Sequence, residues 1–84
     1  MERLEQLQQE IDAIFAGRFD TRIASRDVDL IETGLVDSVR IVELVLELER
    51  RFGVSLPFEE LEIDDFRTVA RLAARIARTL PAAG

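Results

Sequence analysis

Apolar residues recur at intervals of three and four along three stretches of the chain, which predicts three principal helices. Residues 2–16 form the first, with Gly17 placed to end it. Residues 37–52 form the second, closed by Gly53, and residues 67–80 form the third. The apolar positions of the first helix are separated by Glu and Gln: Leu4, Leu7, Ile11 and Ile14. No stretch alternates with the period of two that marks a half-buried strand, so the expected fold class is all-α.

The segments between these helices differ in character. Residues 18–36 have no sustained period but hold several apolar side chains, which indicates a long loop packed on the domain, and long ordered loops tend to be functional. Residues 58–65, after Pro57, predict a short helix. The expected architecture is therefore a small four-helix bundle with a long first loop, in which three main helices and one short helix form a single domain over residues 1–84.

The second helix has two apolar sides when its residues are placed about 100° apart. One continuous stripe is expected to face the core: Ile41, Leu44, Val45, Leu48 and Phe52. The other side carries Val39 and Leu46, where a helix with one buried face is normally polar. Isolated exposed apolar residues are common, so an ordinary surface is one interpretation. The other is a docking patch for a basic, partly apolar groove, ringed by Glu43, Glu47 and Glu49.

Acidic residues are concentrated around this helix. The chain has 17 acids and 11 bases, a net charge of −6, and every base is arginine. Residues 27–49 hold seven acids and one base, Arg40, whereas residues 59–65 hold five acids and no base. Acidic chains repel phosphate backbones, so nucleic acid is not an expected partner. The four arginines of residues 67–78 lie opposite the apolar face of the third helix, which predicts a solvated surface.

Several chemistries are excluded by the residues that the chain lacks. Without cysteine there is no disulfide or thiolate chemistry, and a cytoplasmic location is the default expectation. No apolar run approaches the ~20 residues of a membrane span. Because histidine and lysine are also missing, no side chain is expected to activate a serine nucleophile, and the G-x-S-x-G motif of the hydrolases is absent.

Asp37 and Ser38 stand where the long loop gives way to the second helix. Asp37 at the N-cap can accept a hydrogen bond from the amide of residue 39 or 40, which explains its presence without any further function. Ser38 is then not needed for capping, and its hydroxyl is expected to point outward. A phosphate ester there would lie at the amino end of a helix, where free amides favour an anion. As an isolated motif, Asp-Ser has little specificity, and a foreign catalyst would have to activate the hydroxyl.

The run "DLIETGLVDSVRIVELVLELERRFGVSLP" resembles the core of the acyl and peptidyl carrier proteins. The resemblance extends to Pro57, the acidic short helix and "FRTVARLAARIA", and "GLVDS" resembles the discrete carriers of the D-alanyl carrier type. The residues that carry it are Gly34, Leu35, Asp37, Ser38, Val42, Glu43, Leu44, Val45, Leu48, Glu49 and Phe52. Val39 replaces the usual leucine or methionine. Arg40 stands where many members are acidic or neutral, which weakens the acidic face and bears on the choice of partner.

The resemblance implies an acyl-carrier-protein-like fold and a function. Ser38 would be the attachment point of 4′-phosphopantetheine, moved from coenzyme A by a phosphopantetheinyl transferase, and Asp37 would be helix cap and transferase contact. The chain would be a non-catalytic, monomeric shuttle for acyl or aminoacyl thioesters between loading and processing enzymes. The implied recognition face for these partners consists of Val39, Glu43, Leu46 and Glu47. The cargo stays open among fatty acyl, polyketide, amino acid and D-alanyl groups.

Two other functions are alternatives to a carrier. A small acidic helical adaptor, which binds one protein partner without a prosthetic group, explains the acidity and the Val39/Leu46 patch equally well. It leaves the pairing of Asp37 with Ser38 as a coincidence of capping. A metal-binding module on "EELEIDD" is the weaker alternative, because the calcium-loop spacing with its central glycine is missing. No metal ligand is therefore expected.

Overall fold

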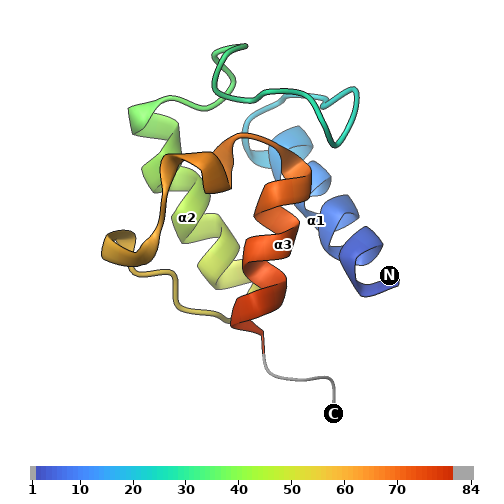
Figure 1. Cartoon of the computed structure of the whole chain (residues 1–84). Helices are drawn as coiled ribbons and strands as arrows, with labels where there is room; N and C mark the ends of the chain where they lie inside the picture. Colours follow the sequence, from blue (N-terminus) through green and yellow to red (C-terminus); the bar gives the residue numbers. More distant parts are fainter. Residues whose placement is uncertain (1, 81–84) are drawn as a thin grey trace.

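The computed structural model describes residues 2–80, and all its regular elements are helical (Figure 1). In chain order they are α1 (Glu2–Arg18), α2 (Ser38–Phe52), the 3₁₀ helices η1 (Phe58–Glu60) and η2 (Ile63–Phe66), and α3 (Val69–Thr79). No strand occurs between residues 2 and 80, and the expected all-α fold class is confirmed. The single short helix expected between α2 and α3 is in fact two successive 3₁₀ turns.

The three α-helices enclose one hydrophobic core, in which α1 packs along α3 and η2 packs against α3 (Figure 1). The largest fully buried side chains come from all three helices and from the long loop: Ile11, Phe15, Leu30, Leu44, Val45, Leu48, Val69, Leu72 and Ile76. The core stripe expected on α2 is confirmed at its centre, while Ile41 and Phe52 are partly buried and pack at the edge of the core.

The helix boundaries correct the sequence-based expectations at two places. Gly53 ends α2 as expected, in the left-handed conformation (φ 65°) that glycine adopts without strain. Gly17, by contrast, lies inside α1, and the left-handed residue is Asp20 (φ 52°), just past the helix end. The α3 helix begins later than expected because Thr68 is its N-cap, with its Oγ1 accepting from the Arg71 amide at 3.0 Å.

The segment of residues 19–37 crosses the end of the bundle at which α2 begins (Figure 1). Leu30 and Val36 are buried, and five further apolar side chains pack against the core from this segment: Phe19, Ile23, Val28, Ile31 and Leu35. The expectation of a packed rather than a solvated loop is therefore confirmed.

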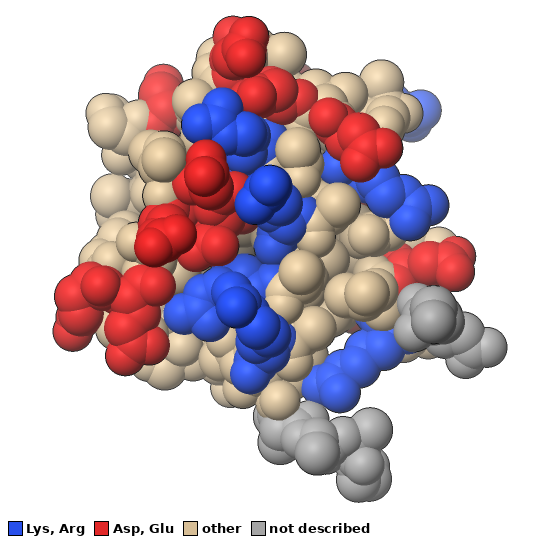
Figure 2. Space-filling model, viewed as in Figure 1, with Lys and Arg blue, Asp and Glu red and all other residues tan. Residues whose placement is uncertain are grey.

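The arginines near the carboxyl end are not all solvated, which corrects the sequence-based prediction. Figure 2 shows arginines along the middle of the face over α3, with acidic side chains beside them. The Arg75 side chain is only 16% exposed and lies 3.8 Å from Asp65 and 3.9 Å from Glu60. Arg67 forms ion pairs with two aspartates. Helical periodicity places these arginines opposite the core, but it says nothing of acidic side chains that other segments bring to them.

Candidate functional site: a serine in the first turn of a capped helix

The start of α2 is built around Asp37. Its backbone is extended (φ −124°, ψ −175°), and its Oδ1 accepts hydrogen bonds from the amides of Val39 at 3.0 Å and Arg40 at 2.8 Å. The Asp37 carbonyl accepts the first helical bond, from the Ile41 amide at 2.9 Å. Asp37 thus satisfies two of the amides that a helix start leaves without partners. The predicted role of Asp37 as N-cap is confirmed.

Ser38 is the first residue of α2 and is exposed. Its hydroxyl forms no hydrogen bond with any other described residue, and the amides of Val39 and Arg40 are bonded to Asp37. The hydroxyl is therefore accessible from outside at the amino end of a helix, where the helix dipole favours a negatively charged ester. The chain has no histidine or lysine that could take the proton of this hydroxyl.

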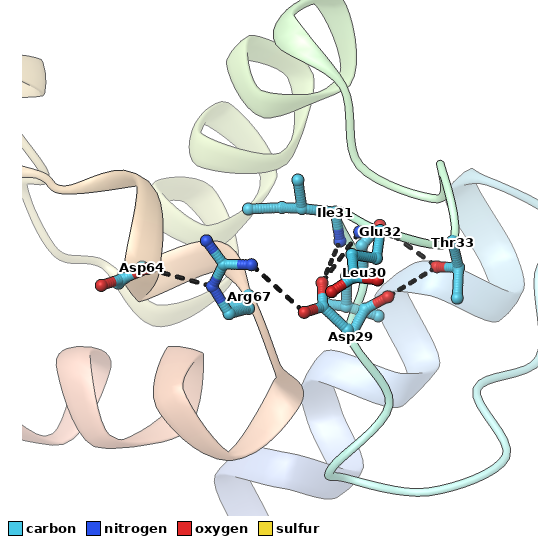
Figure 3. A network of polar contacts seen from close by, with 7 residues as sticks. All are labelled: Asp29, Leu30, Ile31, Glu32, Thr33, Asp64 and Arg67. Carbon is cyan, nitrogen blue, oxygen red and sulfur yellow. Dashed lines mark hydrogen bonds and ion pairs between the residues drawn. The ribbon is translucent and has the colours of Figure 1, made fainter.

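The loop that leads to Ser38 is anchored at Asp29 (Figure 3). Asp29 Oδ1 accepts from the amides of Ile31 at 3.0 Å and Glu32 at 2.8 Å, and Oδ2 accepts from Arg67 Nη1 at 3.2 Å. The Glu32 amide is the main cause that holds the pKa of Asp29 below its ordinary value, and the Arg67 guanidinium adds to the effect. Arg67 Nε also donates to Asp64 at 3.0 Å. One arginine thus joins the loop to the η2 turn.

Backbone contacts continue this anchoring towards the serine. The Leu30 amide donates to the Arg67 carbonyl at 2.7 Å, and the Val36 amide donates to the Leu30 carbonyl at 2.9 Å. Gly34 lies between them with φ 80°, a left-handed conformation in which a side chain would be strained. The glycine of the carrier-like motif is therefore required by the turn that brings the chain to the N-cap.

The exposed side of α2 carries three apolar side chains in one stripe. Val39 is 69% exposed, Leu46 59% and Val42 46%, and Glu43 is exposed beside them. Sequence reasoning proposed Val39 and Leu46 for this surface but not Val42. The spacing of the three, at positions i, i+3 and i+7, is the signal that would have identified it.

The other two glutamates proposed to ring this patch have partners within the chain. The Glu47 side chain is 20% exposed and lies 3.6 Å from both Arg18 and Arg50. Glu49 accepts a hydrogen bond from the Leu56 amide at 2.7 Å and so orders the turn after α2. Glu43 is consequently the acidic side chain that is most accessible beside the stripe, and the surface is less acidic than the sequence suggested.

The acidic run of residues 59–65 is engaged in local structure. Asp65 Oδ2 accepts from the Glu62 amide at 3.0 Å, which caps η2, and Asp64 pairs with Arg67. In the part of the chain from residue 2 to 80, no group of three or more acidic side chains is arranged to hold a metal ion. Across the same residues, no helix has the length and apolarity that a bilayer crossing requires.

Comparison with known proteins places these features in a wider group. The family described as "Phosphopantetheine attachment site" matches residues 7–76. The D-alanyl carrier protein of Lactococcus lactis subsp. cremoris (strain MG1363) is 44% identical over 50 residues, which cover 60% of this chain and 63% of the relative. D-alanyl carrier protein 2 of Lactiplantibacillus plantarum is 35% identical over 51 residues, 61% of this chain and 64% of the relative. The matched part thus spans less than two thirds of these relatives.

Proposed function

This chain belongs to the phosphopantetheine attachment-site family of carrier proteins, and from that premise we propose that Ser38 bears a 4′-phosphopantetheine arm on which the protein carries acyl or aminoacyl groups. The observation that supports this assignment most strongly is the exposed, unbonded Ser38 hydroxyl, next to a cap that already satisfies the first amides of α2. The residues present fit the group, because the Ser38 hydroxyl is accessible and lies at the amino end of α2, where the helix dipole favours an anionic ester.

The proposed attachment is a phosphoryl transfer carried out by a phosphopantetheinyl transferase. The Ser38 oxygen would form a bond to the β-phosphorus of coenzyme A, and the bond from that phosphorus to the bridging oxygen of the diphosphate would break. Adenosine 3′,5′-bisphosphate would leave with that oxygen, and a base of the transferase would take the hydroxyl proton. Asp37 keeps the first turn of α2 in place and contacts the transferase. The dipole of α2 then favours the anionic phosphodiester, while the amides of Val39 and Arg40 stay bonded to Asp37. When attached, the arm supplies a terminal thiol that holds the cargo as a thioester.

We further propose an aminoacyl cargo, with D-alanine as the first candidate. This rests on the names of the relatives, which are D-alanyl carrier proteins at 35–44% identity. The direct test is to incubate the phosphopantetheinylated protein with ATP, D-alanine and an enzyme that adenylates D-alanine. A D-alanyl thioester that hydroxylamine cleaves supports the proposal, whereas a phosphopantetheinylated protein that gains no D-alanine contradicts it.

The proposed docking surface for transferase and loading enzymes is the exposed stripe of α2 with Glu43. Three exposed apolar side chains and one accessible carboxylate suit a partner with an apolar, basic groove. Glu47 is proposed as an edge contact, since its ion pairs with Arg18 and Arg50 use part of its charge. Weak and rapidly reversible contacts suit a carrier that has to leave each enzyme. A monomeric, cytoplasmic carrier is the state in which we expect these encounters.

The rival proposal is an adaptor that binds one partner through α2 and has no prosthetic group. Intact-mass measurement separates the two. After incubation with coenzyme A, Mg²⁺ and a broad-specificity transferase, a carrier gains the mass of one phosphopantetheine, whereas an adaptor keeps its mass unchanged.

A further inference from the structure

Arg40 does not extend from α2 into solvent. Its Nη1 donates a hydrogen bond to the Leu35 carbonyl at 3.2 Å, and its guanidinium carbon lies 5.4 Å from the centre of the Phe19 ring. The distance to the ring is within the range of a favourable cation–π contact. The sequence alone identifies Arg40 as a charge that weakens the acidic face, whereas the structure gives it two partners on the loop side.

The residues that Arg40 joins lie on both sides of Ser38 in the sequence. The bond from Arg40 to Leu35 joins the first turn of α2 to the residue two places before the N-cap, so Ser38 lies inside the segment that the bond closes. Phe19, in turn, contacts Phe15 with ring centres 5.5 Å apart, and Phe15 is fully buried. The segment around Ser38 is thereby connected through Arg40 and Phe19 to the core at the end of α1.

We propose that Arg40 is a positioning residue, which holds residues 35–38 against the end of α1 and so presents the Ser38 hydroxyl to the transferase in an ordered segment. The inference rests on the proposed attachment at Ser38 and adds a determinant of its rate. A segment that is already ordered loses little conformational entropy when the transferase binds. The free-energy cost of forming the productive complex is therefore lower.

A different role for Arg40 is purely electrostatic, as one positive charge beside an anionic substrate. The two roles differ in what they require of Phe19. A positioning role depends on the ring, because the ring connects Arg40 to the core. An electrostatic role depends on the charge of Arg40 alone, so a substitution of Phe19 should not affect that role.

The test uses the full chain without the arm and compares four single variants and one double variant with the wild type. Arg40→Gln removes the charge, Arg40→Lys keeps it, and Phe19→Leu removes the ring. Arg71→Gln, an exposed arginine on α3, is the matched control. Two quantities are measured: the amide hydrogen exchange of Val36, Val39 and Arg40, and the kcat and KM of phosphopantetheinylation with coenzyme A and a broad-specificity transferase. Circular dichroism verifies that each variant is folded.

For Arg40→Gln we expect the exchange of these three amides to rise about three- to tenfold. The KM for the carrier should rise roughly two- to tenfold, because the enzyme has to order the segment itself, while kcat stays unchanged. In Arg40→Lys the rises in exchange and KM should be smaller than in Arg40→Gln. Phe19→Leu should show part of the same rises. In the double variant Phe19→Leu/Arg40→Gln, the change in free energy that corresponds to the rise in KM should be smaller than the sum of the two single changes.

Three results overturn the proposal. Arg40→Gln could show the same amide exchange and KM as the wild type, its exchange could rise uniformly along the whole chain, or Phe19→Leu could leave KM unchanged. Failure of the attachment at Ser38 is recognised separately, because the wild type would then gain no phosphopantetheine or Ser38→Ala would still gain it. The exchange measurement needs no transferase and therefore tests the ordering by Arg40 in either case.

Discussion

The Asp37 carboxylate accepts hydrogen bonds from two backbone amides of α2, whereas the neighbouring Ser38 is exposed and its hydroxyl forms no hydrogen bond with any other described residue. Adjacent side chains thus have separate roles at one helix start. Asp37 stabilises the helix, and Ser38 is left available for chemistry. This division makes the two residues distinguishable by measurements that involve no partner.

Substitution of Asp37 should cost stability, and substitution of Ser38 should not. We expect Asp37→Ala to lower the free energy of unfolding by about 1 kcal/mol, because two amides of the first turn lose their acceptor. Ser38→Ala should change it by less than about 0.5 kcal/mol. Urea unfolding followed by circular dichroism provides both values. Equal losses in the two variants would show that the serine also contributes to the cap.

The depressed pKa of Asp29 predicts a pH-dependent contribution to stability. Because the pKa is lower in the folded than in the unfolded chain, the contribution is fully present above the ordinary value of 3.8 and is lost as the pH falls through the folded-state pKa. Asp29→Asn keeps an oxygen for the amides of Ile31 and Glu32 but removes the charge opposite Arg67. The variant should therefore be less stable than the wild type at neutral pH, and the difference should shrink in acid.

Urea midpoints measured from about pH 6 to about pH 3 test this expectation. Glu32→Gln is the control, because it removes a neighbouring exposed carboxylate and leaves the contact between Asp29 and Arg67 in place. A stability difference for Asp29→Asn that is constant over this range would contradict the assigned role of the Asp29 charge.

Two leucines of α2 form a matched pair for separating core from surface. Leu44 is fully buried, whereas Leu46 is 59% exposed. Leu44→Ala should lower the free energy of unfolding by about 2–5 kcal/mol, because it leaves a cavity, and Leu46→Ala should lower it by less than about 0.5 kcal/mol. Denaturant unfolding measures both. A loss at Leu46 as large as that at Leu44 would place the proposed docking stripe in the core.

Glu43 should contribute to encounters with partners through its charge. We expect Glu43→Arg to reduce kcat/KM for phosphopantetheinylation several-fold at low ionic strength, with a smaller effect as salt screens the charges. The control is Glu5→Arg, which changes the net charge equally at an exposed site on α1. The same reduction in both variants would indicate an effect of net charge rather than of the α2 surface.

The fold was predictable where local chemistry decides it. The capping of α2 by Asp37, the left-handed Gly53 and the core stripe around Leu44 follow from patterns within one helix. The end of α1 was misplaced because Gly17 can occupy an ordinary helical position, and the chain turns only at Asp20. A glycine permits a left-handed residue without requiring one.

The candidate site shows the same limit. The positions of Asp37 and Ser38 were readable from the sequence, and so were two of the three exposed apolar residues of α2. The contacts of Arg40 with Phe19 and of Arg67 with Asp29 were not, because each joins segments that only the folded chain brings together. Helical periodicity can show which charged side chains lie outside the core, but it does not show which partners they contact in the folded chain.

The attachment of one phosphopantetheine to Ser38 is the central claim, and peptide mapping by mass spectrometry tests it most directly. The chain is incubated with coenzyme A, Mg²⁺ and a broad-specificity transferase and is then digested. The account predicts that one phosphopantetheine mass is found on the peptide containing Ser38, is absent from Ser38→Ala, and is retained in Ser55→Ala, a variant of another exposed serine. Modification that persists in Ser38→Ala, or a wild type that gains no mass, would contradict it.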